Sequence, residues 1–271
     1  GIEQVAAWDI LFPAPEGARL KAAGDKMGVR LATSAADAVA ETDMVIAAVT
    51  AASSLEAAQS VAPHLKGNPY YLDINSVSPG RKQATEKLLG GKARYVDVAV
   101  IAPIHPKRHR TPLLIAGPYA EGIAPLLAEM EMTLKVVPGE TGKAAAIKMI
   151  RSVMIKGLEA LTLECYLAAS RAGLLDEVLV SMKNNYPTLD FGAMGDYNIE
   201  RMASHGERRA AEMEESAVTL RELGLEPLMV EATVARQREM GKLGKKDAVR
   251  ATLEDGRAAM LDAISAAKNN G

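Results

Sequence analysis

Short apolar runs alternate with amphipathic segments through the first half of the chain. The apolar runs are strand-like and lie at 5–9, 44–50, 70–74, 95–101 and 113–116. The segments between them have helical spacing and lie at 15–27, 34–41, 53–64, 79–89 and 121–132. This alternation predicts a doubly wound α/β domain with a mainly parallel sheet.

From about Thr141 onward the pattern changes to successive helices. Breaks between them are indicated near Gly173, 186–195, 224–227 and 241–246. We therefore expect an α/β domain at 1–138 followed by an all-α domain at 139–271. A chain of 271 residues is long enough to bury a sizeable core in this arrangement.

Composition narrows the class of protein. The formal net charge is −2, with 48% hydrophobic and 24% charged residues, which argues against a nucleic-acid partner. No apolar run approaches the length of a membrane span, so no membrane partner is expected. The single cysteine, Cys165, favours a reducing, cytoplasmic setting and is expected to be a small core residue. The histidines are scattered without ligand spacing, so no metal site is predicted.

The stretch 139–161 contains a glycine-punctuated turn followed by a long helix. Lys148, Ser152 and Lys156 follow one another at helical spacing, with Arg151 and Glu159 beside them. The residues expected on the opposite, apolar side are Ile147, Ile150, Met154, Leu158, Leu161 and Cys165. The polar arc is either a functional site or the solvent face of an amphipathic helix.

The expected carboxyl ends of the strands form a second group of candidates, because ligands of such sheets bind there. Asp9 ends the first strand and can accept hydrogen bonds from ribose hydroxyls, which favours NAD over NADP. Val49 and Thr50 end the next strand and are expected at the cofactor. Asn75 and Ser76 follow the strand after that, although an ordinary turn and helix cap would have a similar sequence.

These residues resemble motifs of the β-hydroxyacid dehydrogenase family, which includes 3-hydroxyisobutyrate and 6-phosphogluconate dehydrogenases. Gly139, Gly142 and Lys148 keep the spacing of the family's interdomain-helix motif, with Ala144 at the third glycine. The sequence DINSVSP at 73–79 is similar to the family's D-x-S-T-x-S-P. The resemblance implies a Rossmann-type NAD(P)-binding domain, an all-α C-terminal domain like that of 6-phosphogluconate dehydrogenase, and Lys148 as the catalytic residue.

Departures from the family pattern suggest a distinct branch. The substrate loop D-x-P-V-S-G-G aligns with 97–103, where Asp97 is retained but the serine and both glycines are missing. Arg151 and Ser152 replace two asparagines and can still bind an acid group. With Ser76, Asp97 and Lys156 they form the predicted substrate site. The family's first strand and G-x-G-x-x-G turn have no counterpart in the sequence, so we expect them before Gly1.

Other charged positions have alternative interpretations. The basic run at 107–110 is either a solvated loop or an aid to binding an anionic substrate. His205 and Arg208 lie on a charged helical stretch, which is either an exterior or dimer-contact face or a segment that approaches the nicotinamide.

Three functions stay open on the sequence. The first is an NAD- or NADP-dependent dehydrogenase or reductase that transfers hydride to or from a hydroxyacid or related carbonyl compound, with Lys148 as general acid/base. The second is an imine reductase, and the third is a non-catalytic dinucleotide-binding or sensing protein. The substrate is expected to be a small, anionic molecule. The apolar faces of the long helix and the helices after it favour a homodimer or higher homo-oligomer.

Overall fold

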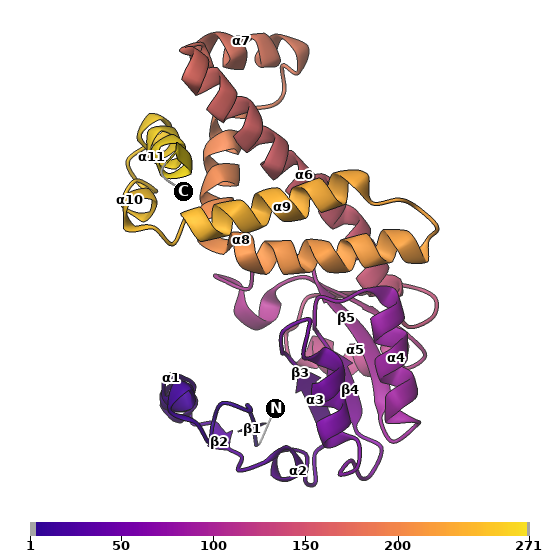
Figure 1. The fold of residues 1–271 in the computed structure, drawn as a ribbon. Coiled ribbons are helices and arrows are strands. Elements are labelled where there is room, and N and C mark those ends of the chain that lie inside the picture. Colours follow the sequence, from indigo (N-terminus) through magenta and orange to yellow (C-terminus); the bar gives the residue numbers. More distant parts are fainter. Residues whose placement is uncertain (1–3, 270–271) are drawn as a thin grey trace. The chain divides into compact units, whose positions relative to one another are not determined.

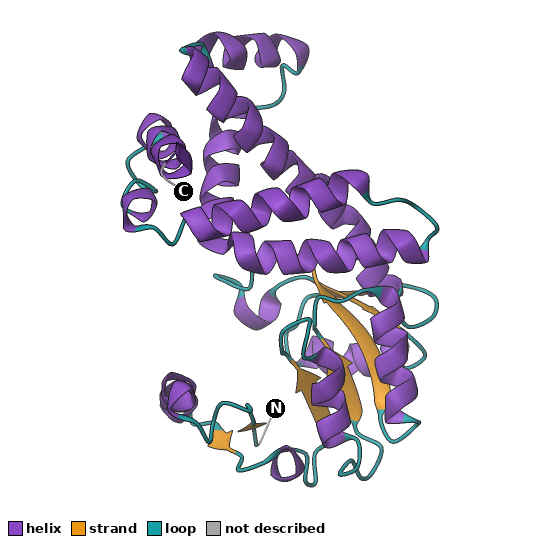
Figure 2. Ribbon diagram, in the orientation of Figure 1, coloured by secondary structure: helices purple, strands orange, loops and turns teal. Residues whose placement is uncertain are grey.

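A computed structural model describes residues 4–269 of the chain (Figure 1). The chain divides into two compact units, Gly1–Lys148 and Met149–Gly271. The first unit contains all the strands of the described residues, and the second is helical (Figure 2). The sequence placed the boundary at 138/139, before the long helix, whereas the division by contacts assigns the first turns of that helix to the first unit.

A five-stranded sheet forms the centre of the first unit. Its order along the sheet is β3-β4-β5-β6-β7, and only the β5–β6 pair is antiparallel. The mainly parallel α/β fold predicted from the sequence is thus confirmed. The strands are β3 (Met44–Ala47), β4 (Tyr70–Asp73), β5 (Arg94–Val100), β6 (Leu113–Ala116) and β7 (Leu134–Val136).

A separate parallel pair lies at the start of the described chain. It consists of β1 (Ala6–Ala7) and β2 (Arg30–Leu31). Sequence analysis found β1 but missed β2 and β7, because a charged residue, Arg30 or Lys135, interrupts the apolar run in each. The strand and glycine turn expected before Gly1 lie outside the described residues.

Helices cover the strands of the first unit, and Figure 1 shows α3 and α4 beside β3–β5. Ser78 begins α4 as an N-cap, accepting a hydrogen bond from the Arg81 amide, and Pro79 occupies the first turn. The helix cap, which the sequence at 73–79 left open as an alternative, is therefore present. The helical segments of this unit are η1 (Pro15–Gly17), α1 (Ala18–Lys26), α2 (Ala35–Ala38), α3 (Ser54–Val61), α4 (Pro79–Leu89), η2 (Arg108–Arg110) and α5 (Ala120–Glu129).

The central strands are buried on both faces. Tyr71 and Tyr95 pack with residues of α3 and α4, whereas Leu72 and Val96, one position further along β4 and β5, pack with residues of α5. Successive side chains of a strand point to opposite faces of the sheet. This double burial explains why the strands appear in the sequence as continuous apolar runs.

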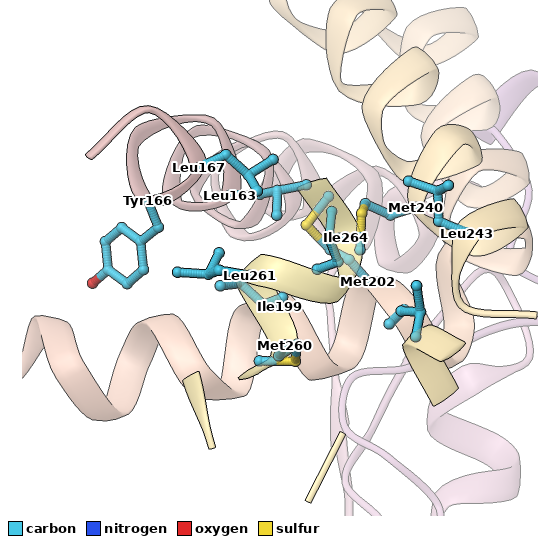
Figure 3. Close-up of a cluster of buried hydrophobic side chains, with 12 residues drawn as sticks. Leu163, Tyr166, Leu167, Ile199, Met202, Met240, Leu243, Met260, Leu261 and Ile264 are labelled. Atoms are coloured by element: carbon cyan, nitrogen blue, oxygen red, sulfur yellow. The ribbon is translucent and has the colours of Figure 1, made fainter. Parts of the chain in front are cut away.

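The second unit is built from long helices around an apolar core. Figure 3 shows that core, to which α6, α8, α9 and α11 contribute side chains such as Leu163, Ile199, Met240 and Leu261. The helices are α6 (Lys143–Ala172), whose first turns lie in the first unit, α7 (Leu175–Asn185), α8 (Phe191–Glu222), α9 (Leu228–Leu243), α10 (Asp247–Arg250) and α11 (Arg257–Asn269). Within residues 4–269, no helix has the length and apolar character needed to cross a membrane.

Helices α8 and α9 approach each other closely at glycines. A Cβ atom on Gly206 would lie 2.2 Å from the Gln237 carbonyl oxygen, and one on Gly241 would lie 2.4 Å from the Glu207 amide nitrogen. Real Cβ atoms do not approach so closely, so glycine is required at both positions. This contact fixes the part of α8 that carries the charged groups described below.

The long helix α6 buries polar residues and exposes apolar ones. The polar residues Ser152, Lys156 and Glu159 are only 7%, 5% and 2% exposed, whereas Met154 and Leu161 are 65% and 56% exposed. The interpretation of the polar arc as a solvent face is therefore wrong for these residues. Periodicity identified the two faces correctly but does not show which one is covered.

Candidate active site

The carboxyl ends of β3 and β4 are joined by the side chain of Asn75. Its amide group donates to Asp73 Oδ1 at 2.7 Å, and its own oxygen accepts a hydrogen bond from the Val49 amide at 2.7 Å. Asn75 is buried, while Val49 and Thr50 are exposed at the end of β3. The residues predicted at the cofactor from these two strands thus lie at one edge of the sheet, with an exposed surface available.

Lys148 reaches the same loop from α6. Its Nζ donates a hydrogen bond to Ser76 Oγ at 2.5 Å, and both residues are half-buried. The turn before the helix makes this approach possible, since Gly142 has a positive φ of 101° and a Cβ atom there would lie 3.0 Å from Pro79 Cβ. Two of the residues selected from the sequence are therefore in direct contact.

Asp97, which was expected to bind substrate, is instead completely buried on β5. Its Oδ2 accepts hydrogen bonds from the backbone amides of Gly142, Ala144 and Ala145 at 3.0–3.1 Å. The Gly142 amide immediately precedes α6 and the other two belong to its first turn, where backbone donors need an external acceptor. Burial raises the pKa of Asp97, against the opposing effect of nearby Lys82. Asp97 therefore supports the helix that carries Lys148 and has no surface to offer a substrate.

Lys82 on α4 is a further buried charge, which sequence analysis missed. Its Nζ lies 2.5 Å from the Asp73 carbonyl oxygen, 3.1 Å from Asp73 Oδ1 and 3.7 Å from Asp97 Oδ1. The signal in the sequence was its position on the stripe that also contains Thr85 and Leu89, both buried. A lysine on such a stripe must be paired or functional.

Asp9 follows β1, as the sequence predicted. The residue is half-buried, and its Oδ1 accepts a hydrogen bond from the Leu11 amide at 2.8 Å. This bond forms a local turn of the kind that aspartate commonly stabilises. The second carboxylate oxygen gives the side chain further capacity to accept hydrogen bonds.

A second polar cluster lies within the unit Met149–Gly271. The buried ammonium of Lys156 donates to Ser152 Oγ at 3.1 Å and lies 3.0 Å from Glu212 Oε2 on α8. Burial lowers the pKa of Lys156, and the opposing effect of Glu212 reduces that shift. Arg151, the other residue predicted here to bind substrate, is exposed.

Glu159 extends this cluster toward α8 and α9. Its carboxylate accepts hydrogen bonds from both the Nε and a terminal nitrogen of Arg209, and from Gln237 Nε2 at 2.7 Å. Sequence analysis identified Glu159 but not its partners, because Arg209 and Gln237 lie on separate helices. Buried charges of this kind require partners on neighbouring elements.

The remaining charged candidates lie on exposed surfaces. Arg208 forms an ion pair with Glu212 one turn away, and His205 is exposed near it. The pKa of His205 is lowered by burial and by neighbouring arginines. In the basic run 107–110, Arg110 pairs with Glu131 at 2.6 Å. Within residues 4–269, no group of three or more His, Cys, Asp or Glu side chains is arranged to hold a metal ion.

Comparison with known proteins gives a family context to this geometry. Residues 169–240 match a domain of unknown function, DUF1932. A conserved hypothetical protein from Sinorhizobium meliloti is 33% identical, with a TM-score of 0.77 over 97% of this chain and 88% of that one. The conserved protein MTH1747, described as similar in structure to 3-hydroxyacid dehydrogenases, is 28% identical, with a TM-score of 0.69 over 88% of each chain.

Functionally named enzymes share the fold at lower identity. The 3-hydroxyisobutyrate dehydrogenase of Mycobacterium tuberculosis is 17% identical, with a TM-score of 0.66 over 97% of this chain and 90% of that one. Imine reductases share the same fold. The Sinorhizobium protein is similar enough, over nearly all of both chains, to define the relationship. The chain therefore belongs to the family of this conserved hypothetical protein, with the fold of 3-hydroxyacid dehydrogenases.

Proposed function

We propose that the protein is an NAD(P)-dependent oxidoreductase that acts on a hydroxyacid or a related carbonyl compound. The observation that carries this proposal is the 2.5 Å contact between Lys148 Nζ and Ser76 Oγ at the carboxyl end of β4. A proton-transferring amine and a hydroxyl meet there, at the edge of a parallel sheet where ligands bind. The fold shared with 3-hydroxyacid dehydrogenases supports the same class of reaction.

Lys148 handles the proton in this proposal. Its amine accepts the proton of the substrate hydroxyl during oxidation and returns it to the carbonyl oxygen during reduction. Ser76, as the hydrogen-bond partner of Lys148, orients the amine and can contact the same oxygen. A bound nicotinamide cofactor would supply the hydride chemistry.

The residues at the strand ends suit the ribose and nicotinamide parts of such a cofactor. Asp9 after β1 suits ribose hydroxyls and favours NAD over NADP by repelling a 2′-phosphate. Val49 and Thr50 are exposed, and Asn75 fixes the backbone at Val49 by its 2.7 Å hydrogen bond. In this proposal Asp9 lies at the ribose of the cofactor, and Val49, Thr50, Asn75 and Ser76 lie toward its nicotinamide end.

The substrate is proposed to be a small anionic molecule. Arg151, Ser152 and Lys156 supply cationic and hydroxyl groups that suit an acid group. In the structure Lys156 is paired with Glu212 at 3.0 Å, so an acid that binds there must compete with this carboxylate. Arg151 is exposed, so an acid group can reach it from solvent.

Imine reduction is the second candidate, because imine reductases share this fold. Retention of Lys148 favours the hydroxyacid reaction, since the resemblance on which the lysine was assigned is to hydroxyacid dehydrogenases. A non-catalytic dinucleotide-binding protein is the third candidate. It predicts cofactor binding without turnover of any carbonyl, imine or hydroxyacid compound.

Cofactor binding and turnover test the proposal in sequence. Nicotinamide fluorescence of NADH and NADPH is measured with the full-length protein, with Asp9→Ala and with Lys148→Met. We expect NADH to bind the native protein and Lys148→Met but to bind Asp9→Ala weakly. A panel of hydroxyacids should then be oxidised by the native protein and not by Lys148→Met. Failure of the native protein to bind either nucleotide would overturn the proposal.

We also infer that the protein is a homodimer or a higher homo-oligomer. The apolar side of α6 carries large exposed side chains at helical spacing, with Met154 65%, Leu158 40% and Leu161 56% exposed. Such a stripe is costly to leave in water, and a second copy can cover it with the same stripe about a twofold axis.

A further inference from the structure

A buried lysine, Lys82, lies between two carboxylates on the neighbouring strands β4 and β5. Asp73 and Asp97 are register partners on the parallel strands β4 and β5, so their carboxylates lie side by side. Both are buried, at 1% and 0% exposure. Like charges so close in a low-dielectric interior repel strongly, and they require a common cation. Lys82, which is 0% exposed, is that cation.

One carboxylate binds the loop that contains Ser76, and the other binds the start of the helix that contains Lys148. Asp73 Oδ1 accepts from the backbone and side-chain nitrogens of Asn75, which fixes the loop that contains Ser76. Asp97 Oδ2 accepts the amides of the first turn of α6, which carries Lys148. Lys82 is therefore shared between the support of the hydroxyl and the support of the amine.

One oxygen of Asp97, Oδ1, depends on Lys82 more than either oxygen of Asp73 does. Tyr95 donates to Asp73 Oδ2 at 2.7 Å, in addition to the two nitrogens of Asn75. In contrast, Asp97 Oδ1 is buried without a hydrogen-bond partner among the described residues, and Lys82 is the cation that faces it, at 3.7 Å. Loss of the ammonium would thus act first on the carboxylate that caps α6.

We propose that Lys82 is a positioning residue for Lys148, because its charge holds the paired carboxylates of Asp73 and Asp97 in the arrangement that brings Lys148 to Ser76. Lys82 has no contact with substrate in this role. Its contribution to turnover rests on the proposed function, whereas its effect on the surroundings of Lys148 does not. The charged groups that face it are Asp73 of β4 and Asp97 of β5. The titratable groups beside these carboxylates are Tyr95, which donates to Asp73, and Tyr71.

The first test measures Lys148 directly and requires no turnover. Lysines of the full-length protein are reductively methylated with a ¹³C label, and the Lys148 signal, assigned with Lys148→Arg, is titrated by NMR. In Lys82→Met we expect the Lys148 titration to leave its native course and to match that of Ser76→Ala. The matched control is Lys87→Met, which removes an exposed lysine from the same helix and should leave the signal unchanged. A native Lys148 titration in Lys82→Met would overturn the proposal.

The second test uses charge compensation and separates positioning from folding. Lys82→Met leaves two buried carboxylates without a cation, whereas Lys82→Met/Asp97→Asn leaves one, and the new amide oxygen can still accept the α6 amides. We expect kcat to fall about 100-fold in the single variant, the cost of a misplacement of roughly 1 Å, with substrate KM little changed. The double variant should regain most of the loss and the native Lys148 signal. Equal defects in the single and double variants would overturn the proposal.

Lowering the pH should reduce the kcat defect of Lys82→Met and have no such effect on the double variant. A proton on one carboxylate replaces the missing ammonium, so kcat of Lys82→Met relative to native should rise as the pH falls. The double variant should show no such relative rise. If the native protein turns over no substrate, the proposed function fails while the NMR arm still decides the role of Lys82, so the two failures are distinguishable.

Discussion

Lys148 and Ser76 are separated by 72 positions in the sequence, yet Lys148 Nζ lies 2.5 Å from Ser76 Oγ. The amine comes from the second turn of α6, and the hydroxyl comes from the loop after β4. Buried side chains fix both backbones: Asn75 holds the loop, and Asp97 holds the start of the helix. The contact thus joins two segments, the loop after β4 and the start of α6, whose backbones are each held by a buried side chain.

The serine and the lysine should have unequal effects on turnover. We expect Lys148→Met to lower kcat by about 10²- to 10⁴-fold, the usual contribution of a general acid/base, and Ser76→Ala to lower it only about tenfold, because the amine remains. Both variants should retain NADH binding by fluorescence. Steady-state kinetics on the best hydroxyacid substrate provide the measurement.

Ser60→Ala is the matched control for the serine, since Ser60 is exposed on α3 and bonds only to the local Ala57 carbonyl among the contacts observed. Native kcat in Ser76→Ala would contradict a role for this hydroxyl in positioning the amine.

Removal of the Asp97 carboxylate should destabilise the first unit in a way that an amide does not. Asp97→Ala leaves the amides of Gly142, Ala144 and Ala145 without their acceptor, which costs about 1–3 kcal/mol per buried unsatisfied group. Asp97→Asn keeps an acceptor oxygen and should retain most of the stability. Chemical denaturation followed by circular dichroism measures the difference, and equal stability of the two variants would show that the cap is dispensable.

The pH dependence of Asp97→Asn has a definite sign. Because burial raises the folded-state pKa of Asp97, the folded chain binds more protons than the unfolded chain between the ordinary value of 3.8 and the raised value. The native protein therefore loses stability as the pH rises through that window. We expect the stability of Asp97→Asn relative to native to increase as the pH is raised above about 4 in paired urea titrations. A relative decrease over this range would show that the carboxylate stabilises the fold when ionised.

Sequence periodicity predicted those parts of the structure that depend on the residues of one short segment. The runs containing Tyr71, Leu72, Tyr95 and Val96 became central strands, since residues apolar on both faces require cover on both sides. The family resemblance likewise implied that Lys148 and Ser76 belong to one site. These features depend on local pattern or on a resemblance carried by adjacent positions.

Features that depend on distant partners were not predictable. Lys82 was missed because its two carboxylates come from strands whose register is set by folding. Asp97 was assigned to substrate because its sequence position cannot show that three amides of α6 cover it. The polar arc of α6 was known as a face, but its burial depends on Arg209 and Gln237, which lie on other helices.

The buried cluster of the second unit should depend on charge balance. Glu159→Ala leaves the buried guanidinium of Arg209 without its carboxylate, and we expect a loss of about 3–5 kcal/mol in the free energy of unfolding. Glu159→Leu/Arg209→Met removes both charges and should cost clearly less. Urea denaturation of the native, single and double variants measures this comparison. An equal loss in both variants would show that packing, and not an unpaired charge, determines the cost.

The exposed apolar face of α6 should control self-association. Met154 is 65% exposed, with Ile150 and Leu158 one turn before and after it at 49% and 40%. A carboxylate at this position would have to be desolvated if a second copy covered the stripe, so Met154→Glu should shift the native oligomer toward the monomer. Size-exclusion chromatography with light scattering measures the mass. The matched control is Met27→Glu, which changes a methionine 71% exposed in the first unit and should leave the mass unchanged. A native protein that is monomeric at every concentration, or a Met154→Glu variant with native mass, would show that the stripe is not the contact between copies.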